Sequence, residues 1–172
     1  GDPNLSNRKF PYDSKVERDG PPEKILAELG DQLVARGIKQ IEGDIVADDS
    51  YFPAERYASG WAIDDMTSGY GAPVSALTVN DNTLVVELRP ADREGDFTWF
   101  GVEPWAEFYE IVNEVRTAAA GAKPDVSADR EPGSRRVVLR GSIPLGAEPR
   151  RITLAVEEPA EFAAALLKRL LE

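Results

Sequence analysis

The last third of the sequence changes from a strand pattern to a helix pattern within a few residues. Residues 135–144 (RRVVLRGSIP) and 150–159 (RRITLAVEEP) are rich in β-branched residues and are bounded by turn-forming residues, which predicts two β-strands. Residues 159–172 (PAEFAAALLKRLLE) then carry apolar side chains at helical spacing, and Pro159 suits the first turn of a helix. A chain that contains both patterns is expected to mix helices and strands.

The first half of the sequence predicts one helix followed by one strand. Between a proline pair and Gly37, apolar residues recur at helical spacing, and this pattern predicts a helix over residues 22–36. Residues 40–47 alternate between polar residues and residues that are apolar or small, which predicts a strand. Residues 1–20 and 53–75 show no sustained period and are expected to be irregular.

The middle of the chain is less regular. Residues 75–90 (SALTVNDNTLVVELRP) predict two strands joined by a turn at residues 80–82. Residues 107–117 (EFYEIVNEVRT) fit both a helix and a strand, so the pattern alone leaves both open. Residues 121–133 are mostly polar and predict a connection that leads into the last two strands.

Aromatic residues gather between these segments, in the stretch DFTWFGVEPW. The bulkiest of them are Trp99, Phe100 and Trp105. Large aromatic side chains contribute much of the buried area in a core, so these three are expected to pack inside the protein rather than to form a platform for a ligand.

The sequence contains no cysteine and no histidine, which excludes several kinds of chemistry. Without cysteine there is no disulfide, no thiolate nucleophile and no cysteine metal site. Without histidine there is no histidine-containing triad, and most zinc sites are excluded. The net charge of −11 disfavours nucleic-acid binding, and the arginine pairs at 135–136 and 150–151 are expected to be solvated strand ends. No apolar run is long enough to cross a bilayer.

Three short motifs could carry chemistry, and each has a simpler explanation. Ser6 and Lys9 match the Ser-x-x-Lys motif of serine acyl-transfer enzymes, but Ser-x-Asn and Lys-Thr-Gly are missing, so this is a chance match in a loop. Asp64 and Asp65 are adjacent, so their side chains should point apart and serve a turn or a helix cap. Residues 80–82 (NDN) lack the spacing of a calcium loop.

Longer blocks of sequence, taken in order, resemble one known family. They are GDPNLS at 1–6, RGIKQIEGDIVADDSYF at 36–52, GW at 60–61, DDMTSGYGAPVSALTVNDN at 64–82, NEVRT at 113–117 and GSIPLG at 141–146. Together they resemble the D-alanyl-D-alanine carboxypeptidases of the class C low-molecular-mass penicillin-binding proteins, the penicillin-binding-protein-4 type. The resemblance covers essentially the whole chain.

In that family a catalytic domain carries the serine and lysine early, a long insertion follows, and Ser-x-Asn and Lys-Thr-Gly come after it. The present chain looks like that insertion alone, which would explain the missing motifs. A start at Gly1 without an initiator Met is expected of a processed protein or a piece of a longer one. The resemblance therefore implies no catalytic residue in this chain, no metal and no cofactor. It also implies strands rather than a helix at 107–117.

The resemblance assigns a role to three residues. In the family, the stretch before YGAPVSAL approaches the catalytic cleft and helps to form the pocket for the substrate side chain. The matching residues are Asp65 and Tyr70, with Trp61 as a weaker addition. The chemistry is suitable, because a diamino acid of the peptidoglycan stem peptide offers an ammonium to a carboxylate and an aliphatic stem to an aromatic wall. A purely structural turn is the alternative.

These observations predict an α+β fold with two lobes, one built from a helix and a strand and one mostly antiparallel β. The expected divisions are 1–75 as the helix–strand lobe at the cleft, 76–156 as the β-rich lobe, and 157–172 as a helix that returns to the first lobe.

The expected function is that of the non-catalytic insertion of an exported or periplasmic serine-type carboxypeptidase and endopeptidase. Its partners would be the catalytic domain of the same polypeptide and, through the parent enzyme, the peptidoglycan stem peptide. Two alternatives stay open. One is a stand-alone cell-wall binding or interaction module, and the other is a histidine-free carboxylate enzyme that uses Asp64 or Asp65.

Overall fold

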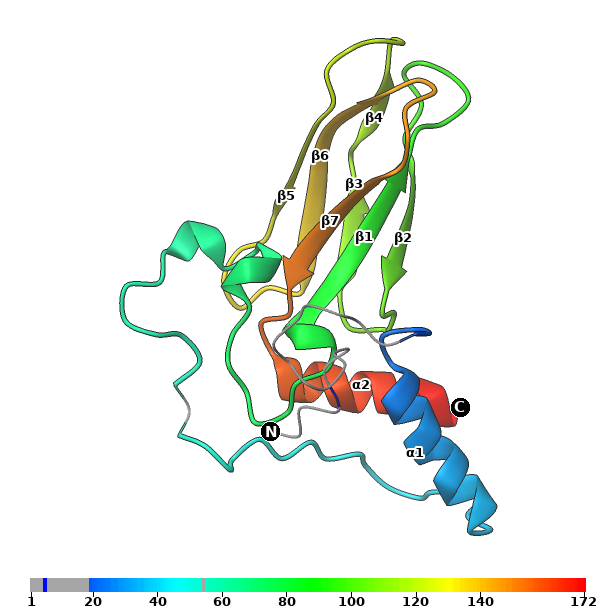
Figure 1. Cartoon of the computed structure of the whole chain (residues 1–172), viewed down its shortest axis with the longest axis vertical. Helices are drawn as coiled ribbons and strands as arrows, with labels where there is room; N and C mark the ends of the chain where they lie inside the picture. Colours follow the sequence, from blue (N-terminus) through cyan, green and yellow to red (C-terminus); the bar gives the residue numbers. More distant parts are fainter. Residues whose placement is uncertain (1–4, 6–18, 54) are drawn as a thin grey trace.

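Two helices and two small β-sheets are arranged as Figure 1 shows, in a computed structural model that describes Leu5, residues 19–53 and residues 55–172. The helices are α1 (Lys24–Ala35) and α2 (Pro159–Leu171), and three short 3-10 turns are η2 (Ile63–Asp65), η3 (Gly69–Gly71) and η4 (Asn80–Asn82). The strands are β1 (Thr83–Arg89), β2 (Trp99–Glu103), β3 (Glu110–Asn113), β4 (Arg116–Ala118), β5 (Asp125–Asp129), β6 (Arg136–Pro144) and β7 (Arg150–Ala155).

One sheet is antiparallel and the other is mixed. In the first, β1 lies between β2 and β7, and Val86 of β1 pairs with Val102 on one side and Ile152 on the other. In the second, β6 pairs in parallel with β3 along its first half and with β4 along its second half. Strand β5 pairs with β6 in the antiparallel direction. This combination of helices with largely antiparallel sheets confirms the predicted α+β class.

Side chains from both sheets and both helices meet in one core. Its members from the strands include Val86, Leu88 and Leu139, which are almost completely buried. Helix α2 runs across the lower end of the strands (Figure 1) and contributes Phe162 and Leu166 to this core. Since apolar burial is the main favourable term in folding, α2 is an integral part of the fold.

The helix predicted over residues 22–36 is confirmed as α1, and it ends where the sequence indicated. Gly37 has a φ of 85°, the left-handed conformation in which glycine commonly stops a helix. Helix α1 packs beside α2, where Arg169 donates a hydrogen bond of 2.9 Å to Glu23. A Cβ atom at Gly30 would lie 3.4 Å from the Cδ2 atom of Leu171, an ordinary van der Waals distance, so the two helices lie side by side at this position.

Most of the other elements predicted from the pattern are confirmed. Strands β6 and β7 and helix α2 lie where the last third of the sequence placed them. Residues 107–117, which the pattern left open and the resemblance assigned to strands, contain β3 and most of β4, with a break at residues 114–115. The turn at residues 80–82 is also present, and all three residues have positive φ values of 49°, 54° and 55°, which asparagine and aspartate tolerate better than most residues.

Two strand predictions are wrong. Residues 40–47 form no strand and pair with no strand in the described part of the chain, and Ile41 and Val46 are 52% and 84% exposed. The alternation was present, but a strand also needs a neighbour to pair with. Residues 75–79 form a local turn instead, because the Ser75 hydroxyl accepts a hydrogen bond from the Leu77 N–H and the Thr78 hydroxyl donates to the Ser75 carbonyl.

The predicted connection at residues 121–133 contains a strand, β5, which is also a correction. Val126 and Ala128 are half-buried while their neighbours are exposed, so the short stretch alternates as an edge strand does. The aromatic residues expected in the core are largely outside it: Trp99, Phe100 and Trp105 are 71%, 44% and 46% exposed. Trp99 and Phe100 lie on β2, at the edge of its sheet, so they are covered less than the side chains of β1, and Trp105 lies beyond the end of β2.

Candidate functional site

Residues 61–71 form a compact ribbon of two 3-10 turns, η2 and η3, and we call this stretch the site ribbon. Its backbone closes on itself at each turn, because the Ser68 N–H donates to the Asp65 carbonyl at 3.0 Å and the Gly71 N–H donates to the Ser68 carbonyl at 2.8 Å. These local hydrogen bonds shape the ribbon without a long helix or strand. They also bring residues that are five apart in the sequence close together.

The closest side-chain pair on the ribbon is Tyr70 with Asp65. The Tyr70 hydroxyl donates a hydrogen bond of 2.7 Å to Oδ1 of Asp65. Tyr70 is 75% exposed and Asp65 is half-buried. The tyrosine ring of the pair therefore faces solvent, while the carboxylate is partly covered by the protein. A carboxylate has acceptor capacity for several donors, so a bond to Oδ1 leaves room for a cationic donor.

Glycines at two positions allow the ribbon to fold this tightly. A Cβ atom at Gly71 would lie 2.0 Å from the carbonyl oxygen of Asp65, a distance that no side chain can occupy. A Cβ atom at Gly69 would lie 2.5 Å from the Cγ2 atom of Thr153 on β7. The first glycine sets the turn that places Tyr70 over Asp65, and the second lets the ribbon lie on the sheet.

The third residue expected at the site, Trp61, lies at the start of the ribbon and is 41% exposed. Its ring packs near the ring of Tyr57, with the centroids 6.4 Å apart. The structure therefore brings Asp65 and Tyr70 into direct contact, while the contact of Trp61 is with another aromatic residue. Asp64 is exposed and Asp65 half-buried, so the two adjacent carboxylates have different surroundings, as expected for neighbours in a turn.

The ribbon is attached to the free edge of β7. Ser68 forms an antiparallel bridge with Leu154, and the Ala155 N–H donates to the Thr67 carbonyl at 3.0 Å. Beside this attachment a cavity of about 470 Å³ opens between the ribbon, β5 and β7, and Tyr70 is among its lining residues. The site ribbon is thus held at the β-sheet through β7.

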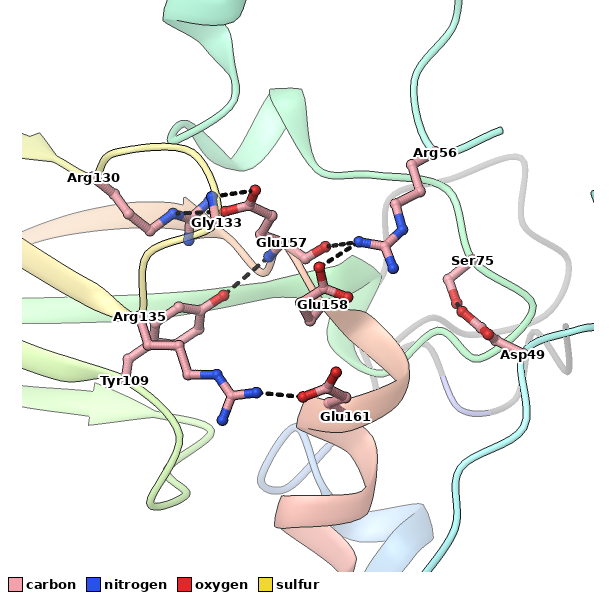
Figure 2. Close-up of polar contacts among 10 residues, drawn as sticks. All are labelled: Asp49, Arg56, Ser75, Tyr109, Arg130, Gly133, Arg135, Glu157, Glu158 and Glu161. Carbon is pink, nitrogen blue, oxygen red and sulfur yellow. Dashed lines mark hydrogen bonds and ion pairs between the residues drawn. The ribbon is translucent and has the colours of Figure 1, made fainter. Parts of the chain in front are cut away.

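A buried arginine, Arg130, reinforces this attachment, and Figure 2 shows it beside its acidic partner Glu157. The side chain of Arg130, directly after β5, is only 2% exposed. Its guanidinium donates to the Ala155 carbonyl at 2.6 Å and to the Met66 carbonyl at 3.1 Å. Glu157 balances its charge, with an Nε–Oε2 separation of 3.7 Å. Burying a charge is costly unless it is paired and hydrogen-bonded, and here both conditions are met.

The same cluster includes a buried tyrosine. The Glu157 N–H donates to the Tyr109 hydroxyl oxygen at 3.0 Å, and Glu157 Oε1 accepts a bond of 2.7 Å from the Gly133 N–H. Burial raises the pKa of the Tyr109 phenol, and the neighbouring Arg130 opposes part of that rise. Glu157 is therefore a junction that joins the β5–β6 connection, the end of β7 and the core aromatic residues.

Figure 2 also shows how the segment before the ribbon is held. Arg56 donates to Glu158 at 2.5 Å, and this hydrogen bond raises the pKa of the guanidinium above its usual value. Burial raises the pKa of the Tyr57 phenol, with the Glu157 carboxylate adding to the rise. Ser75 donates to Asp49 at 3.3 Å on the far side of the same region.

Sequence reasoning missed Arg130, Glu157 and Tyr109. Arg130 precedes a Glu-Pro-Gly turn, where an arginine is ordinarily solvated, so the sequence offers no signal for its burial. Ser6 and Lys9, the chance Ser-x-x-Lys match, lie outside the described residues. Within residues 19–53 and 55–172, no group of three or more acidic side chains is placed to hold a metal ion.

None of the helices in the described part of the chain is both long and apolar enough to span a bilayer.

Comparison with known sequences shows what the chain resembles. A profile of the D-Ala-D-Ala carboxypeptidase 3 (S13) family matches residues 1–172.

Among curated relatives, a D-alanyl-D-alanine carboxypeptidase of Actinomadura sp. (strain R39) is 31% identical over 153 residues, which is 86% of this chain and 28% of that protein. D-alanyl-D-alanine carboxypeptidase DacB of Haemophilus influenzae is 27% identical over 163 residues, which is 94% of this chain and 33% of that protein. The chain thus spans about a third or less of the length of these relatives.

Comparison with solved structures supports the same fold. The crystal structure of penicillin binding protein 4 (dacB) from Haemophilus influenzae superposes with a TM-score of 0.67 at 23% identity, over 90% of this chain and 34% of that one. A second structure of that protein, complexed with a β-lactam, gives a TM-score of 0.56 over 89% of this chain and 31% of that one. At these identities the match concerns the fold.

Proposed function

The chain belongs to the D-Ala-D-Ala carboxypeptidase 3 (S13) family, and on that premise we propose that it is the non-catalytic insertion region of a serine-type carboxypeptidase and endopeptidase. The parent enzyme would be exported or periplasmic and would act on peptidoglycan stem peptides. Two observations support a fragment without catalytic residues. The chain corresponds to 28–33% of its curated relatives, and it contains neither Ser-x-Asn nor Lys-Thr-Gly.

The observation that carries the functional part of the proposal is the Tyr70–Asp65 hydrogen bond. It holds a carboxylate and a solvent-facing aromatic ring together on a rigid turn. In the proposed pocket, Asp65 accepts a charge-assisted hydrogen bond from the side-chain ammonium of a diamino acid, and Tyr70 lies along its aliphatic stem. Trp61 would extend the aromatic wall on the side nearer to Tyr57.

The proposed organisation keeps three parts: 1–75 bordering the catalytic cleft, 76–156 as the β-rich lobe, and 157–172 as the returning helix. The packing of α2 against α1 supports the third part. Because the site ribbon is attached to β7, residues from both 1–75 and 76–156 position Asp65.

A β-lactam experiment tests the absence of catalytic residues. We expect that incubation of this chain with a labelled β-lactam gives no covalent adduct in an intact-mass measurement, because the serine chemistry of the parent requires all three motifs. The Haemophilus influenzae penicillin binding protein 4, which has been crystallised with a β-lactam, serves as the positive control. An adduct on Ser6 would contradict the proposal.

An apolar groove offers a place for the catalytic domain of the same polypeptide. It has a volume of about 840 Å³ and lies between α1, residues 38–45 and α2. Ile41 lines it and is 52% exposed, and Val34 lines it and is 67% exposed. About two thirds of each curated relative lies outside the matched region, so the parent has ample chain to cover this surface. We propose that the catalytic domain does so.

The groove predicts a difference between the isolated chain and the parent enzyme. Ile41→Asp should lower the melting temperature of the full-length parent, because it would bury an unpaired charge at the domain contact. It should change the stability of the isolated chain little. Val46→Asp, in the same segment but outside the groove and 84% exposed, is the matched control.

Differential scanning calorimetry of both variants in both contexts gives the comparison. Equal effects of the two substitutions in the parent would contradict the assignment. If the isolated chain instead forms a dimer that Ile41→Asp disrupts, as measured by sedimentation, the groove is an interface between copies and the catalytic-domain assignment is wrong.

A further inference from the structure

Arg130 has no role in the proposed pocket chemistry, yet it is one of the most completely buried charged side chains near the site. Only 2% of its side chain is exposed, and the guanidinium lies 5.4 Å from the centre of the Tyr109 ring. Exchanging a buried ion pair for apolar side chains is often neutral or stabilising, so general stability is a weak explanation for such an arginine. Its specific contacts offer a better one.

Those contacts join three segments that are distant in the sequence. Arg130 itself belongs to the β5–β6 connection, the Ala155 carbonyl ends β7, and the Met66 carbonyl belongs to the site ribbon. The planar guanidinium can donate in two directions from one rigid group, which a lysine ammonium cannot reproduce with the same geometry. Arg130 therefore fixes the distance between the ribbon and the edge of the sheet.

The contact of Arg130 on the site ribbon is at Met66, next to Asp65, the residue proposed to bind the substrate ammonium. Met66 directly follows Asp65, and the next residue, Thr67, accepts the hydrogen bond from Ala155 N–H. The peptide units that follow Met66 and Thr67 are thus held by the sheet side, while the Tyr70 hydroxyl holds the Asp65 carboxylate. The side chain of Asp65 and the two residues that follow it are therefore positioned before a substrate arrives.

We propose that Arg130, supported by Glu157, is a positioning residue that sets the preference of the parent enzyme for peptides with a free side-chain ammonium. It does so through the site ribbon and without touching the substrate. The inference rests on the proposed function of Asp65. It adds that the β-rich part of the chain controls specificity, because Arg130 lies in that part and Glu157 directly follows it.

The test is a double-mutant cycle in the full-length parent enzyme. Arg130→Lys keeps the charge and removes the two-directional contact. We expect it to raise KM for an ammonium-bearing peptide and to lower the preference for that peptide over a simple acyl-D-Ala-D-Ala peptide by about two- to tenfold, the value of one hydrogen bond. The rate of acylation by a β-lactam should stay unchanged, which also reports that the parent is folded.

The decisive comparison uses Asp65→Asn as the second substitution. If Arg130 acts through Asp65, Arg130→Lys should have no further effect on the preference once Asp65 is asparagine. Arg135→Lys is the matched control, because Arg135 lies in the same connection but pairs with the exposed Glu161 on α2. It should leave the preference unchanged in both backgrounds.

The outcomes separate the two proposals. If Asp65→Asn itself leaves the preference unchanged, the proposed function is wrong. If Asp65→Asn abolishes the preference but Arg130→Lys has no effect or an additive one, Arg130 is only structural and this inference is overturned. Should Arg130→Lys fail to fold, Glu157→Gln carries the same cycle, because it keeps an acceptor for the Gly133 N–H and removes the charge that orients Arg130.

Discussion

Asp65→Asn in the full-length parent enzyme is expected to lower kcat/KM for peptides with a free side-chain ammonium by roughly ten- to 150-fold. The estimate follows from a charge-assisted hydrogen bond worth about 1.5–3 kcal/mol, at about tenfold per 1.36 kcal/mol. Simple acyl-D-Ala-D-Ala peptides should be affected much less, because they present no ammonium and the serine chemistry lies elsewhere in the parent.

The geometry of the site makes asparagine a suitable replacement. It has the shape of aspartate, and its side-chain oxygen can still accept the hydrogen bond from the Tyr70 hydroxyl. The turn should therefore survive while the charge is lost. Tyr70→Ala should add a smaller loss on the same peptides, because it removes only the wall along the aliphatic stem.

Asp64→Asn is the matched control for the charge. Asp64 is exposed on the same 3-10 turn, so its replacement changes the net charge equally without touching the Tyr70 contact. Steady-state kinetics with both peptides distinguish the possible results. Equal losses on the two peptides, or no loss on either, would mean that Asp65 is structural and that the pocket assignment is wrong.

The elements that the sequence predicted well are those specified by local patterns. Helix α2 and strands β6 and β7 have strong periodicity, and the turn at residues 80–82 uses residues that tolerate positive φ. At these positions the residue propensities, the hydrophobic pattern and the tertiary packing favour the same structure, so a prediction from the local sequence is correct.

The failures have physical causes that a local pattern cannot contain. Residues 40–47 alternate like a strand, but pairing depends on a neighbour, and the described residues provide none. Strand β5 is polar on one side because it lies on the sheet edge, so its sequence resembles that of a polar connection. Trp99 is exposed for a similar reason, since an aromatic residue on an edge strand need not face the core.

The candidate site shows the same limit more sharply. Asp65 and Tyr70 were identified by resemblance, and their contact spans five residues through two turns, a spacing that helical periodicity does not predict. Arg130 reaches the site from 64 residues away in the sequence. Contacts of this kind are set by how the sheet edge and the ribbon meet, which only the folded structure reveals.

Gly71→Ala is expected to disrupt the site ribbon more than any conservative change on its surface. The added methyl group would lie 2.0 Å from the Asp65 carbonyl oxygen, and that oxygen belongs to the backbone, so the turn itself must move. Overpacking of this kind costs about 1–3 kcal/mol. We expect a loss of that size in the free energy of unfolding of this chain, measured by denaturant titration.

Gly101→Ala is the matched control, because Gly101 lies on edge strand β2 and an added Cβ atom there meets nothing within 4 Å. That change should be neutral or stabilise by up to about 1 kcal/mol through the unfolded state. In the parent enzyme, Gly71→Ala should also remove the preference for ammonium-bearing peptides, since Tyr70 can no longer close over Asp65. If Gly71→Ala is as stable as Gly101→Ala and keeps that preference, the close approach of residues 65 and 71 does not define the pocket.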